Sequence, residues 1–243
     1  MIEEDRVRRA LSAVRDPELD EPITDLGFVR EFQIEGDSVS VTLHLPTYLC
    51  APNFAYIMAA DAKEAVGALE GVGSVQVTLV DHQLSEEINE GLAQGRDFDE
   101  IFPSDTEGTG LVELRARFDS KAFIARQQGI YRALTEAGAT PEQLCRLRIG
   151  QLPDSPDTAR YLDRRARLGI GTSEAAPFLV NADGTPIPEE ELDRHMLFAR
   201  MVSVTIEGNA SFCRGLLATR YGLEPTAEVR TLNRGGDHRR HPD

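Results

Sequence analysis

In the first 95 residues, the spacing of apolar side chains switches between the helical and the strand period, and this order restricts the fold more than any other feature. Helical spacing over 3–14 is followed by two alternating stretches, 28–34 and 39–45, with a short polar turn between them. Helical spacing returns over 54–69, and alternation returns over 74–81. The order of helix, two strands, helix and strand predicts a small α+β domain whose helices pack against one sheet.

The rest of the chain has mainly helical patterns. Apolar spacing predicts helices over 119–137 and 157–168 and from residue 189 onward, and a turn at 181–184 suggests a minor hairpin. We therefore expect an α+β protein with an N-terminal domain over 1–95, an acidic linker over 96–110, a mainly helical domain over 111–232 and a disordered tail over 233–243.

Composition excludes several classes of function. The formal charge is −15, from 41 acidic and 26 basic residues, and an acidic surface repels nucleic-acid phosphates. No apolar run approaches the roughly 20 residues that a membrane span needs, and the first residues do not have the layout of a signal peptide. Three widely spaced cysteines do not form a disulfide framework. We expect a cytoplasmic protein that binds neither nucleic acid nor membrane.

Two loops contain the residues best suited to chemistry. The first joins the opening helix to the first strand and holds Asp16, Glu18 and Asp25. The second runs from Thr47 to Cys50 and leads directly into the second helix. The free backbone amides and the dipole at a helix start favour a thiolate, which is both a nucleophile and a soft-metal ligand.

The two loops, the hairpin and the second helix together resemble the iron–sulfur cluster assembly family that includes the T component of the SUF system and the D protein of phenylacetate degradation. The resemblance covers residues 3–92 and includes Asp-Pro-Glu, Pro-Ile and Asp-Leu-Gly-Phe-Val in this order. It implies that Asp16, Glu18 and Asp25 are motif acids and that Cys50 is a reactive or metal-ligating thiol. Thr47 is a further functional candidate, and no residue is predicted to be catalytic.

Structural roles are the alternatives at each of these positions. Asp16 and Asp25 are equally suited to capping turns, and Cys50 to being an inert buried thiol. The other candidate donors are expected to be structural: His44 and His82 at the surface, Cys145 and Cys213 in helix packing. Because iron–sulfur clusters usually take four protein ligands, Cys50 would need a second subunit, a partner or a histidine to hold one.

The leading hypothesis is a maturation factor that delivers a transiently bound iron–sulfur cluster, or iron, to a client metalloprotein. The second domain would recognise the client, and a homodimer through the N-terminal domain would supply further ligands. A dedicated helper of an iron-dependent oxygenase is a narrower form of this hypothesis. The alternatives are a protein-binding adaptor without metal chemistry, suggested by the bulky cysteine loop, and an enzyme that uses Cys50 as its nucleophile.

Overall fold

The computed structural model describes residues 2–103 and 110–223. The chain divides into two compact units: Met1–Glu107 together with Gly208–Asp243, and Gly108–Glu207. A small three-stranded sheet with helices is followed by a mostly helical region, which confirms the predicted α+β class. The expected tail over 233–243 lies outside the described residues.

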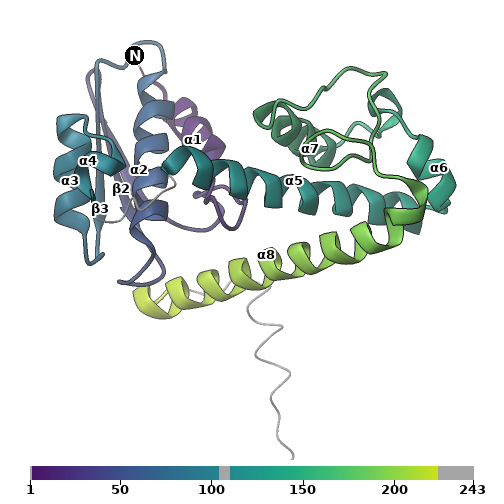
Figure 1. The fold of residues 1–243 in the computed structure, drawn as a ribbon. Helices are drawn as coiled ribbons and strands as arrows, with labels where there is room; N and C mark the ends of the chain where they lie inside the picture. Colours follow the sequence, from purple (N-terminus) through teal and green to yellow (C-terminus); the bar gives the residue numbers. More distant parts are fainter. Residues whose placement is uncertain (1, 104–109, 224–243) are drawn as a thin grey trace, which may run out of the picture. The chain divides into compact units, whose positions relative to one another are not determined.

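The first unit is built on a sheet in the order β1-β2-β3. Figure 1 labels the neighbouring strands β2 and β3. Strand β1 (Val29–Glu35) pairs antiparallel with β2 (Ser38–His44), and β2 pairs parallel with β3 (Ser74–Val80). All three strands lie within about a residue of the alternating stretches in the sequence. Val39, Val41 and Leu43 of β2 are almost fully buried, as the period of two requires.

Three longer helices pack around this sheet. Helix α2 (Pro52–Gly67) and helix α3 (Ser85–Gln94) both contact β3, and α1 (Glu4–Ala13) packs against α2. The short helix α4 (Phe98–Ile101) follows, and the rings of Phe98 and Phe102 are buried. The start of the expected acidic linker is therefore packed into the first unit, while residues 104–109 lie outside the described residues.

Helix α8 (Leu192–Tyr221) is continuous through Gly208. Its last part, residues 208–221, belongs to the first unit. From the sequence, we expected this part to belong to the second domain, 111–232. Leu217 on this part is buried and lies against Gly27, in the loop between α1 and β1.

The second unit contains α5 (Leu111–Glu136), α6 (Pro141–Arg146), α7 (Pro156–Arg167), the start of α8 and two short 3-10 helices, η1 (Ile149–Gln151) and η2 (Glu189–Glu191). Its core is apolar and lies mainly between α5, α7 and the loop at 178–180. None of the described helices is long and apolar enough to cross a bilayer.

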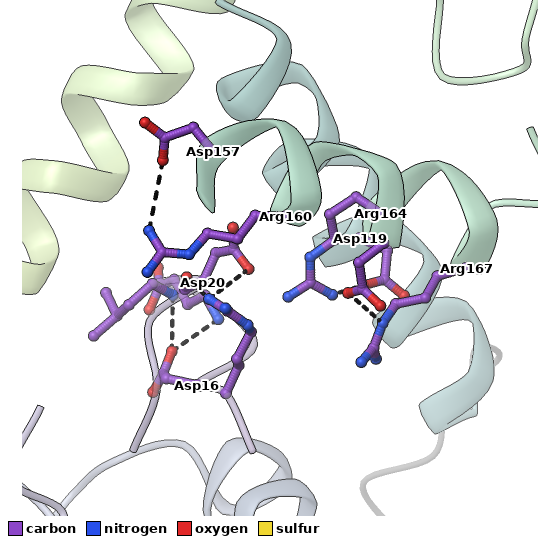
Figure 2. A network of polar contacts seen from close by, with 11 residues as sticks. Asp16, Asp20, Asp119, Asp157, Arg160, Arg164 and Arg167 are labelled. Carbon is purple, nitrogen blue, oxygen red and sulfur yellow. Dashed lines mark hydrogen bonds and ion pairs between the residues drawn. The ribbon is translucent and has the colours of Figure 1, made fainter. Parts of the chain in front are cut away.

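A buried hydrogen-bond network around Arg165 and Tyr161 connects segments of the second unit. Arg165 is almost fully buried, with 1% of the residue exposed. Its guanidinium donates to the carbonyls of Gly171 and Pro177 and to the hydroxyl of Tyr161. The Tyr161 hydroxyl in turn donates to the carbonyl of Phe178 at 2.6 Å. Nearby, Arg164 pairs with Asp119, which joins α7 to α5 (Figure 2). These bonds satisfy polar groups that burial would otherwise make costly.

Candidate functional site

Asp16 caps the turn at the start of the acidic loop. Its carboxylate accepts hydrogen bonds from the backbone N–H groups of Glu18 at 2.9 Å and Leu19 at 2.8 Å (Figure 2). Burial raises the pKa of this carboxyl from 3.8 to about 6, against the lowering effect of the two backbone donors. The capping role that the sequence offered as the alternative is therefore present in the structure. Because both hydrogen bonds join the carboxylate to the backbone of its own loop, Asp16 fixes the conformation of the acidic loop.

The other two acids of the loop have different surroundings. Glu18 is half-buried and accepts a hydrogen bond from the side-chain amide of Asn209 on α8, at 3.4 Å. Asp25 is exposed and accepts from the neighbouring Thr24 hydroxyl at 3.2 Å. Glu21, which the sequence analysis did not select, forms an ion pair with Arg214 of α8. The loop is thus attached to α8 through Glu18 and Glu21, whereas Asp25 points to solvent.

Cys50 lies two residues before α2, so its thiol is near the helix start as expected. The thiol is half-buried, and the Thr47 hydroxyl lies 3.3 Å from the sulfur. Tyr48 and Leu49 between them are exposed, at 55% and 69%. The bulky residues of the loop therefore project into solvent, and Thr47 and Cys50 come together as one small site.

His82 holds the cysteine loop in place. Its Nε2 donates to the carbonyl of Cys50 at 2.8 Å, and its Nδ1 accepts from the N–H of Leu84 at 3.2 Å. A second bond runs from the N–H of Gln83 to the carbonyl of Tyr48 at 3.0 Å. Both ring nitrogens are therefore used internally, and His82 orients Cys50 without being free to ligate a metal.

The prediction that His44 and His82 are surface residues is wrong, since they are only 6% and 4% exposed. The Nε2 of His44 donates to the carbonyl of Gly27 at 2.9 Å, and the Tyr221 ring lies 4.2 Å from the imidazole, between centroids. Burial lowers the pKa of His44 and so favours the neutral ring. Strand alternation placed His44 on a polar face, but α8, far away in the sequence, covers that face.

The end of α8 lies directly on the two loops. Leu217 is 3% exposed, and its side chain is so close to Gly27 that a Cβ on this glycine would be 3.1 Å from it. Gly27 has a φ of +77°, a left-handed conformation that glycine adopts without strain. Arg220 donates to the carbonyl of Leu45 at 3.1 Å and to that of Asp81 at 2.7 Å. The helix is thus bonded to the backbone just before the cysteine loop and just after β3.

Cys213 is a residue whose surroundings sequence reasoning missed. It is half-buried on the part of α8 that lies on the first unit. Burial raises the pKa of its thiol to about 12, and the negative charges of Asp16, Cys50 and Glu18 add to the effect. The expectation that Cys213 only packs in a helical core overlooked these neighbours. No local signal identifies it, because its partners lie more than 160 positions earlier in the chain.

The donor set limits what the site can do. Within the described residues, no group of three or more histidine, cysteine or acidic side chains is arranged to hold a metal ion. Cys145, the third cysteine, is half-buried beside the core of the second unit. The cysteine loop offers one thiol, a soft metal donor, next to the hydroxyl of Thr47.

The fold and the site define a small α+β binding domain with a thiol at the start of a helix. Residues 4–79 match the family of iron–sulfur cluster assembly proteins. The chain therefore belongs to this family through its N-terminal domain, as the resemblance predicted. The match ends at residue 79, so the second unit lies outside it.

Two relatives extend this comparison. An uncharacterized protein from Methanocaldococcus jannaschii is 36% identical over 95 residues, which are 39% of this chain and 98% of the relative. The iron–sulfur cluster carrier protein of Synechocystis is 39% identical over 79 residues, which are 32% of this chain and 22% of that protein. No solved structure matches the chain.

Proposed function

We propose that this protein binds an iron–sulfur cluster, or iron, as transient cargo and delivers it to a client metalloprotein. The observation that carries the proposal is the Cys50 loop: a half-buried thiol beside Thr47 at a helix start, oriented by His82. Membership of the iron–sulfur cluster assembly family supports it, as does the similarity to a cluster carrier protein. Cysteine thiolates are the protein ligands that hold the iron atoms of iron–sulfur clusters, so Cys50 is the residue expected to bind the cargo.

Anaerobic reconstitution with iron and sulfide tests this proposal. Wild-type protein, Cys50→Ser and Cys145→Ser are compared by visible absorption and by iron and sulfide content per chain. Cys145→Ser is the matched control because this thiol is also half-buried but lies in the second unit. We expect the wild type and the control to hold the chromophore and Cys50→Ser to lose it. Absence of bound iron and sulfide in all three proteins would overturn the proposal.

We further propose that the second unit recognises the client. Apolar side chains at Leu197, Met201 and Val204 follow one stripe of α8, with Phe198 beside them, and all four are more than half exposed. The stripe borders a groove between α5 and α8 whose polar rim includes Arg132. An exposed apolar surface with a polar rim is typical of a protein-binding site. A dedicated helper of an iron-dependent oxygenase is the narrower form of the proposal.

Charge substitution on the stripe tests client recognition. Leu197→Asp combined with Met201→Asp should leave cluster binding unchanged and abolish delivery to the client. Arg194→Asp is the control, because this exposed side chain lies on the same helix outside the groove. Iron-dependent activities in a deletion strain that carries each variant provide the measurement. Full complementation by the double variant would refute this role, and complementation by Cys50→Ser would favour a metal-free adaptor.

A further inference from the structure

The cysteine loop displays two large apolar side chains directly before its thiol. Tyr48 and Leu49 are 55% and 69% exposed, and Cys50 follows them in the chain. A single exposed leucine needs no explanation, because much of any protein surface is apolar. A pair of large apolar side chains next to the proposed cargo ligand is different, and its meaning depends on how the pair is held and on what surrounds it.

The backbone of the loop holds this pair in a fixed position. The N–H of Gln83 donates to the carbonyl of Tyr48 at 3.0 Å, and Nε2 of His82 donates to the carbonyl of Cys50 at 2.8 Å. The chain is therefore anchored on both sides of Leu49, while the side chains of Tyr48 and Leu49 stay in solvent. Because the loop is ordered before any partner arrives, binding through this pair costs less conformational entropy.

The surface around the pair has a distinct charge pattern. Residues 38–60 contain no Asp, Glu, Lys or Arg, although 28% of the chain is charged. Residues 81–90, which are hydrogen-bonded to the cysteine loop, contain four acids and no Lys or Arg. Two of these acids, Glu86 and Glu87, are exposed in the first turn of α3. An apolar centre without charge beside a charged rim is the usual layout of a protein interface.

We propose that Tyr48 and Leu49 form the contact on which a client docks while it takes the cargo from Cys50. This inference rests on the proposed function. The ligands of the client must reach the same metal atoms as Cys50, so the client surface comes against the two residues next to it. The acidic rim at 81–90 fits a client surface that has an apolar pocket and basic residues beside its ligand cysteines. A contact of this small size suits a complex that separates after transfer.

Cluster transfer to synthetic acceptor peptides tests the contact. Two tagged peptides contain the same cysteines and leucines, and lysines flank one whereas glutamates flank the other. The full chain, reconstituted with iron and sulfide, is mixed anaerobically with each peptide and an iron chelator, and the iron and sulfide captured with the peptide are measured over time. The main variant combines Tyr48→Ser with Leu49→Ser. The controls are Tyr48→Phe, which keeps the ring, and Val112→Ser, which removes an exposed apolar side chain from the second unit.

The contact predicts a loss of transfer without a loss of cargo. The double variant should fold, as circular dichroism shows, and hold as much iron and sulfide as wild type, but transfer them about 10-fold more slowly. Both controls should match wild type. Wild type should supply the lysine-flanked peptide faster than the glutamate-flanked one, and added salt should reduce this difference. Glu86→Gln combined with Glu87→Gln should reduce it as well.

The outcomes separate the docking contact from the cargo site. Transfer from the double variant at the wild-type rate overturns the contact and leaves the proposed function standing. Loss of iron and sulfide from the folded double variant would mean that the pair holds the cargo itself, which also overturns docking. If wild type sediments as a dimer and the double variant as a monomer, a second copy covers the pair instead of a client. A wild type that binds no iron and sulfide refutes the proposed function and this inference with it.

Discussion

At the scale of single residues, the buried carboxyl of Asp16 dominates the electrostatics of the acidic loop. Its residue is 6% exposed, and burial raises its pKa to about 6. The protonated form is therefore favoured on folding. Its contribution to stability is complete below the unfolded pKa of 3.8 and is lost as the pH rises through about 6.

Asp16→Asn should remove this pH dependence. An asparagine Oδ1 can accept the same two backbone hydrogen bonds without ionising. Between pH 4 and 7, the wild type should therefore lose up to about 3 kcal/mol of unfolding free energy relative to Asp16→Asn. Urea unfolding of both proteins across this range provides the measurement. Parallel stability profiles would show that Asp16 has an ordinary pKa.

Gly27 combines a left-handed backbone angle, which glycine adopts without strain and other residues do not, with a close neighbour. Gly27→Ala should destabilise the protein by about 2 kcal/mol, because alanine is strained at positive φ and its Cβ meets Leu217. Gly36 is the matched control: its φ is +66°, but a Cβ there meets nothing within 4 Å. Gly36→Ala should cost only about 1 kcal/mol. Equal losses in thermal unfolding would mean that α8 does not press on Gly27.

At the scale of elements, the spacing of apolar residues and the position of turn residues in the sequence predicted most helices and strands to within a few residues. The alternation around Val39 and the helical spacing around Val7 correspond to β2 and α1. Sequence patterns within one element did not predict the burial of a side chain that is covered by a segment far away in the sequence. His44 was assigned to the surface because no pattern within its strand reveals that Tyr221 covers it. Cys213 was missed for the same reason.

The attachment of α8 can be tested by releasing it. Leu217→Asp would place a charge in a buried apolar contact, so residues 208–221 should detach from the first unit. The pKa of Cys213 should then fall towards its ordinary value, and its alkylation should accelerate by about 10-fold or more. Peptide mass spectrometry after timed iodoacetamide treatment measures this rate.

The control for this experiment is Thr219→Asp, since Thr219 is exposed on the same part of α8. Its Cys213 alkylation rate should equal that of the wild type. Slow alkylation of Cys213 in a folded Leu217→Asp protein would contradict the packing described here.

At the scale of the whole molecule, the chain joins an iron–sulfur assembly domain to a helical unit outside that family. The motif acids and Cys50 were found in the sequence because they lie in loops next to regular elements. Their separate roles, with Asp16 as a cap, Glu18 as a contact of Asn209 and Asp25 exposed, depend on tertiary packing. The roles of Thr47 and Cys50 in cargo binding stay predictions.

Cluster transfer tests the central claim most directly. Protein reconstituted with iron and sulfide is separated from free ions and mixed anaerobically with an apo-ferredoxin, in the presence of an iron chelator. We predict that the ferredoxin acquires its cluster signal from wild-type protein and from Cys145→Ser, at a rate that the chelator does not change, and that Cys50→Ser supports no transfer. Transfer that the chelator abolishes, or that is equally fast with Cys50→Ser, would contradict a carrier role.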